Sequence, residues 1–94
     1  MTFLVIARDG TDEEAPKRRE AVREAHLERI RPLVDDGTVQ LGGAILDDRG
    51  AMVGSALLIE ADSSAEVRAL LARDIYSTAG VWQEVEVYPF KRAV

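Results

Sequence analysis

Residues 38–61 read TVQLGGAILDDRGAMVGSALLIEA, two apolar stretches around a polar tetrapeptide. The stretches Thr38–Leu46 and Ala51–Ala61 are rich in Val, Ile and Leu, and the β-branched members of that set favour strands. Between them, Asp47-Asp48-Arg49-Gly50 supplies the Asp and Gly that tight chain reversals need. The segment therefore predicts a β-hairpin at the centre of the chain.

One strand and one helix are predicted before this hairpin. Phe3–Ala7 is continuously apolar, which is typical of a short buried strand. Acidic residues and Pro16 then predict a helix that begins between Asp12 and Pro16 and ends before Gly37, with a kink at Pro32. Val22, His26, Ile30 and Leu33 recur at helical spacing and form one apolar stripe on this helix. The charged residues of the segment, Arg18 and Arg19 among them, mostly face elsewhere.

A second helix and a last strand are predicted after the hairpin. Ser63 or Ser64 can cap a helix that runs to about Arg73, with Val67, Leu70 and Leu71 on its inner side. Residues 81–90 then read as a strand. Strict alternation would divide its side chains between two faces, one with Val81, Val85 and Val87, the other with Trp82, Glu84, Glu86 and Tyr88.

The resulting order, strand-helix-strand-strand-helix-strand, is that of a ferredoxin-like α+β fold. We expect a single domain over residues 1–94, in which both helices cover one face of a four-stranded antiparallel sheet. The strands are apolar on both sides, and a large bare apolar face is rare on monomers. A homodimer in which two sheets pack face to face is therefore expected.

Composition limits the kinds of partner and cofactor. Seventeen acidic and twelve basic side chains give a net charge of −5, which does not favour a nucleic-acid partner. The chain has no cysteine and one histidine, so no metal site is expected. Gly42-Gly43 lacks the rest of a dinucleotide fingerprint, so no nucleotide site is indicated. The N-terminal apolar run is too short for a signal peptide or a membrane span, so we expect a cytoplasmic protein that is not bound to a membrane.

His26 is the candidate for proton chemistry. It lies on the apolar stripe of the first helix, four residues from Val22 and from Ile30, where its ring needs a hydrogen-bond partner. One interpretation is a structural histidine bonded to a backbone carbonyl. The other is a general acid or base, because imidazole exchanges protons near neutral pH.

Three further polar residues are candidates for a site. Asp74 follows the second helix, and we expect its carboxylate to enter a loop rather than cap a helix start; it is either a surface carboxylate or held there for a function. Ser55 is a candidate polar wall of a pocket; the alternative, a nucleophile, lacks a Gly-x-Ser-x-Gly motif and would need His26 as an adjacent base. The Tyr76 hydroxyl could donate to a substrate oxygen or belong to a packed aromatic with an exposed tip.

At these residues the chain resembles the YciI-like (YCII-related) proteins. In that family a His-Leu occurs on the first helix, a Gly-Pro near the end of the second strand, a Gly-Ser in the third strand, and an Asp-Pro-Phe with a nearby Ala-Gly after the second helix. The corresponding segments here are Arg23-Glu24-Ala25-His26-Leu27, Gly42-Gly43-Ala44, Gly54-Ser55, Asp74-Ile75-Tyr76 and Ala79-Gly80-Val81. Two positions depart from the family pattern: Ala44 replaces the proline, and Ile75-Tyr76 replaces Pro-Phe.

The resemblance implies a subunit that dimerises as an α+β barrel, related to muconolactone-isomerase-like folds, with His26 and Asp74 as the active-site pair. We expect a cofactor-independent enzyme that transfers a proton on a small cyclic or unsaturated acid, as an isomerase or a lyase, with Ser55, Tyr76 and Gly43 at the substrate. The alternative is a dimeric module that binds a small metabolite or a partner without turnover. A monooxygenase of the same fold is a third possibility, to which no specific residue points.

Overall fold

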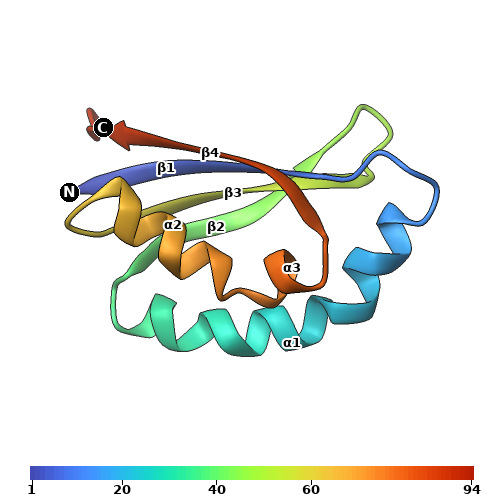
Figure 1. Cartoon of the computed structure of the whole chain (residues 1–94). Coiled ribbons are helices and arrows are strands. Elements are labelled where there is room, and N and C mark those ends of the chain that lie inside the picture. The colour runs from blue at the N-terminus through green and yellow to red at the C-terminus, as the bar shows by residue number, and fades with distance from the viewer.

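The computed structural model describes residues 1–94 as one four-stranded antiparallel sheet with its helices on one face (Figure 1). The strand order is β2-β3-β1-β4, so the ferredoxin-like α+β prediction is confirmed. A short helix, α3, adds to the expected elements. In chain order the elements are β1 Thr2–Asp9, α1 Ala15–Asp35, β2 Val39–Leu46, β3 Met52–Glu60, α2 Ser64–Ala72, α3 Ile75–Thr78 and β4 Trp82–Phe90.

The core lies between the sheet and the helices. The register pairs Val5 of β1 with Leu57 of β3 on one side and with Val87 of β4 on the other, which brings apolar side chains of three strands together on the helix face. Val67 of α2 is completely buried against them, while the predicted stripe of α1 contributes partly buried side chains. The members of the buried cluster are Phe3, Val5, Ala7, Val39, Leu57, Ile59, Val67, Leu71, Tyr76, Val81 and Trp82.

The predicted helix limits are largely confirmed. α1 begins at Ala15 with Pro16 in its first turn and continues through Pro32 to Asp35; Gly37 follows with a φ of 86°, a backbone conformation that glycine adopts without strain. The Ser63 hydroxyl caps α2 by accepting a hydrogen bond from the Glu66 N–H.

The prediction that Arg19 faces away from the core is wrong. Its side chain is only 8% exposed, because a partner carboxylate is available inside the protein. Arg19 Nη1 donates hydrogen bonds to both carboxylate oxygens of Asp9, the last residue of β1, each at 3.0 Å. The Asp9 side chain is itself only 4% exposed. The aliphatic part of Arg19 thereby joins the inner face of α1.

The assignment of Trp82 to the face opposite the valines is also wrong. A register shift between Arg8 and Asp9 pairs Arg8 with Glu84 but Asp9 with Trp82, leaving an extra residue in β4. Such a bulge reverses the alternation of side chains locally. Trp82 therefore lies on the helix face and is buried, while Glu84, Glu86 and Tyr88 keep the predicted orientation.

The other face of the sheet carries no helix (Figure 1). Leu4 and Ile6 of β1 and Leu58 of β3 lie on this outer face and are only partly buried. Leu41 and Tyr88, on the two edge strands, are 65% and 47% exposed. None of the helices is long and apolar enough to cross a membrane.

Candidate active site

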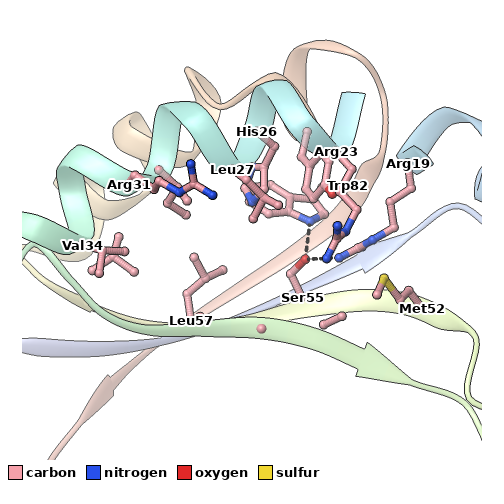
Figure 2. A pocket seen from close by; sticks show the side chains of 16 residues that line it. Arg19, Arg23, His26, Leu27, Arg31, Val34, Met52, Ser55, Leu57 and Trp82 are labelled. Carbon is pink, nitrogen blue, oxygen red and sulfur yellow. Dashed lines mark hydrogen bonds between the residues drawn. The ribbon is translucent and has the colours of Figure 1, made fainter. Parts of the chain in front are cut away.

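A cavity of about 340 Å³ opens between α1 and the β2–β3 side of the sheet (Figure 2). Four of the five residues expected at a site line this cavity: His26, Ser55, Tyr76 and Gly43. Gly43 contributes backbone at the edge strand, where nothing lies within 4 Å of the position a Cβ would take. The fifth, Asp74, lines a separate cavity of about 290 Å³ between α1, the end of α2 and the sheet.

His26 and Asp74 contact each other directly, although 48 positions separate them in the sequence. His26 Nδ1 lies 2.7 Å from Asp74 Oδ1, and the two side chains are 9% and 12% exposed. An ionised carboxylate only accepts hydrogen bonds, so Nδ1 carries a proton in this pair. The interpretation of His26 as a ring bonded to a backbone carbonyl is therefore wrong.

The remaining ring nitrogen, Nε2, is free. It has no hydrogen-bond partner within the chain and is not sealed from the surrounding space. Because Nδ1 holds the proton of the neutral ring, Nε2 presents a lone pair. His26 can thus accept a proton from a molecule in the cavity.

The expectation that Asp74 enters a loop is also wrong, because Asp74 caps α3. Its backbone is extended, with φ −68° and ψ 141°, and Oδ1 accepts from the Tyr76 N–H at 2.9 Å. An acidic side chain is favourable at a helix start, whereas it would be unfavourable at the end of α2. The cap fixes the carboxylate oxygen that holds the His26 ring.

Tyr76 and Trp82 enclose the imidazole. The Tyr76 ring stacks on that of His26, with centroids 3.8 Å apart and planes at 6°, and Trp82 meets both rings edge-on. Burial raises the pKa of the Tyr76 hydroxyl above its usual value, and the positive charges of Arg19 and Arg23 offset part of this effect. The hydroxyl is thus protonated at neutral pH, and it has no partner within the chain.

Ser55 lies on β3 at the floor of the cavity (Figure 2). Its oxygen accepts hydrogen bonds from Arg19 Nη2 and from Trp82 Nε1, each at 3.1 Å. A hydroxyl oxygen has two lone pairs, and both are used. The Ser55 O–H proton has no acceptor within the chain, so Ser55 can only donate to a molecule in the cavity.

Sequence reasoning missed Arg19 and Trp82, which hold Ser55 from two sides. Arg19 precedes His26 by seven residues, two helical turns, so extension of the apolar stripe toward the N-terminus would have found it. The guanidinium carbon also lies 4.9 Å from the centre of the Tyr76 ring. Trp82 carried no signal, because its orientation depends on a bulge.

Comparisons with known proteins name the family to which this fold belongs. Residues 1–91 match the family model of the YCII-related domain. Protein YciI of Escherichia coli is 34% identical, with 98% of both chains covered. The chain belongs to the YCII-related domain family.

Two further relatives carry functional names. Fusaric acid biosynthesis protein 2 of Gibberella fujikuroi is 31% identical, with 95% of this chain and 91% of that protein covered. The structure of 5-chloro-2-hydroxyhydroquinone dehydrochlorinase from Burkholderia phenoliruptrix, in complex with 2,5-dihydroxybenzoquinone, superimposes with a TM-score of 0.83 at 30% identity, covering 99% of this chain and 96% of that one. Similarity to a small-molecule enzyme therefore extends over nearly the whole chain.

Proposed function

We propose that the protein is a cofactor-independent enzyme that uses His26 and Asp74 to transfer protons on a small cyclic or unsaturated acid. The observation that carries the proposal is the 2.7 Å contact between His26 Nδ1 and Asp74 Oδ1, with Nε2 free at the cavity. Asp74 fixes the tautomer of the ring and stabilises the imidazolium once a proton has been taken up. His26 then acts first as a base and afterwards as an acid.

Elimination is the reaction that the comparisons favour over isomerisation. The dehydrochlorinase of Burkholderia phenoliruptrix, by its name, removes hydrogen chloride from a chlorinated hydroxyhydroquinone. For such a substrate, Nε2 would accept a proton from a ring hydroxyl and return it to the carbon that bears the chlorine. Chloride then leaves with the electron pair of its bond while a second hydroxyl gives its proton to Nε2, which is unprotonated again, so that a quinone, chloride and one proton are formed.

Three other residues would orient the substrate. Ser55 and Tyr76 offer hydroxyl protons to substrate oxygens. Gly43 would border the substrate with backbone alone, since it lines the cavity without a side chain.

The protein is also proposed to be a homodimer that pairs through the outer face of the sheet. Partly buried leucines and isoleucine cover the middle of that face, and exposed Leu41 and Tyr88 extend it to both edges. Two copies packed sheet to sheet would remove this apolar surface from water.

The test is chloride release from 5-chloro-2-hydroxyhydroquinone. The wild-type protein is expected to release chloride. The substitutions His26→Ala and Asp74→Asn are each expected to reduce kcat at least about a hundredfold, because a positioned acid-base group usually contributes that much to the rate. Asp62→Asn is the matched control, because this exposed carboxylate precedes α2 and accepts no hydrogen bond. Circular dichroism confirms that each variant is folded.

Two outcomes would overturn the proposal. One is full turnover by folded His26→Ala. The other is a wild-type protein that binds 2,5-dihydroxybenzoquinone without turnover of any halogenated hydroquinone, which would identify a binding module instead.

A further inference from the structure

The charges around the cavity are all of one sign, in contrast to the chain as a whole. The sequence has more acidic than basic residues, and its net charge is −5. Yet the lining of the cavity includes Arg19, Arg23 and Arg31 and not a single Asp or Glu. The cavity is therefore a positively charged pocket in an acidic protein.

Only one of these arginines is neutralised within the chain. Arg19 is paired with Asp9. Arg23 and Arg31 make no ion pair and no side-chain hydrogen bond, although both also line a neighbouring cavity with Glu20, Glu24 and Glu28 of the same helix. In Figure 2 both side chains extend from α1 over the space between helix and sheet. Two unpaired guanidinium groups thus border the cavity.

The deep part of the cavity offers donors and a base. The Ser55 and Tyr76 hydroxyl protons have no acceptor within the chain, and His26 Nε2 lies on the same wall. Leu27 of α1 and Leu57 of β3 supply apolar lining, and Trp82 closes the cavity where Ser55 lies. Arg23 lies on the side of the Tyr76 hydroxyl, whose pKa its charge lowers, whereas Arg31 lies toward Val34, so positive charge borders the cavity at both ends.

From this arrangement we infer that the substrate is an organic anion, bound by Arg23 and Arg31 through a carboxylate or an ionised ring hydroxyl. Guanidinium groups bind such oxygens through charge-assisted hydrogen bonds. The flat apolar body of the ligand lies between Leu27 and Leu57, and one of its oxygens accepts the Ser55 proton. Arg23 and Arg31 are the specificity-determining residues of the site; the inference builds on the proposed function.

Calorimetric titration with 2,5-dihydroxybenzoate and with its neutral amide, 2,5-dihydroxybenzamide, tests this assignment. The wild-type protein is expected to bind the acid about tenfold more tightly than the amide, because a charge-assisted hydrogen bond contributes about a tenfold gain in affinity. The double variant Arg23→Gln/Arg31→Gln is expected to bind the acid and the amide equally. Arg29→Gln is the control, because Arg29 belongs to the same helix but lies outside this cavity.

Equal affinity for acid and amide would overturn the inference, as would an equal loss of acid binding in Arg29→Gln. The readout does not require turnover, so it is separate from the test of the proposed function. A His26→Ala protein that keeps full activity while the arginine variants lose the preference would remove the proton-transfer mechanism and leave the anion site intact.

Discussion

At the scale of single residues, Ser55 connects the fold to the candidate site. Its hydroxyl oxygen accepts hydrogen bonds from two buried donors, on Arg19 and Trp82. Arg19 lies on α1, the helix that carries His26, and the Trp82 ring of β4 meets the His26 ring edge-on. Arg19 is in turn held by Asp9. One oxygen therefore joins α1, β3 and β4 at the floor of the cavity.

Replacement of Ser55 by Ala is expected to lower the free energy of unfolding by about 2 kcal/mol, because two buried N–H groups lose their acceptor. Urea denaturation measures this loss. Ser64→Ala is the control, since Ser64 is exposed and its hydroxyl makes no hydrogen bond. A Ser55→Ala protein as stable as this control would show that the network contributes nothing to the fold.

Asp12 and Arg18 form an ion pair at the surface, and its stabilisation depends on pH. Arg18 Nη1 and Nη2 each donate to one Asp12 oxygen, at 2.8 and 2.6 Å, and these bonds lower the pKa of Asp12 from 3.8 to about 2. A lowered pKa in the folded state means that the stabilisation is complete above pH 3.8 and is lost as the pH falls through about 2.

NMR titration of the side-chain carboxyl carbons should therefore find the Asp12 midpoint near 2, and Arg18→Gln should return it toward 3.8. Lys17→Gln is the neighbouring control, because Lys17 pairs with Glu14 instead. An Asp12 midpoint that is the same in the wild type and in Arg18→Gln would contradict the assignment.

At the scale of elements, the sequence predicted each strand and both long helices because their patterns extend over many residues. The hairpin limits and the Ser63 cap follow from local chemistry. α3 was missed because four residues are too few for a periodic pattern. Trp82 was misplaced because a one-residue bulge reverses alternation, and no local signal marks the bulge.

The candidate site was predictable only in part. His26 stood out as the only polar side chain on an apolar stripe, but its pairing with Asp74 came from the family resemblance, since spacing alone does not relate positions on different elements. Arg19 was assigned to the wrong side because an arginine is normally solvated. Its burial depends on Asp9, a residue of another element.

Close packing between β1 and β3 leaves no room for a side chain at Gly54. A Cβ at this position would lie 2.6 Å from the Ala7 carbonyl oxygen, whereas a Cβ at Gly43 would meet nothing within 4 Å. Gly54→Ala must therefore push the two strands apart. We expect it to lower the free energy of unfolding by about 2 kcal/mol or more, as overpacking does in a well-packed interior.

Urea denaturation of Gly54→Ala beside Gly43→Ala measures this effect, because both substitutions add the same methyl group to a strand. Gly43→Ala is expected to change stability by less than about 1 kcal/mol. Equal losses in the two variants would show that general strand propensity, and not the contact with Ala7, decides the cost.

At the scale of the whole molecule, the sheet has two unlike faces. The inner face is covered by α1 and α2, and its side chains, such as Val5 and Ile59, are completely buried. The outer face is apolar in the middle, where Leu4 and Leu58 lie opposite each other in the register, yet no element of the chain covers them. A monomer would leave this surface in water.

A charged side chain at the centre of the outer face of the sheet tests the proposed dimer. Leu58→Glu would bring two carboxylates together at the interface and bury them without partners, which costs several kcal/mol. Sedimentation velocity should give the wild type twice the chain mass of 10.3 kDa and the variant the mass of one chain. Ala69→Glu adds the same charge on the exposed side of α2 and is expected to leave the dimer intact. A wild type that sediments as a monomer would exclude the dimer. A Leu58→Glu protein that remains dimeric would place the interface on a different surface, because a face-to-face pair of sheets cannot form without burying this residue.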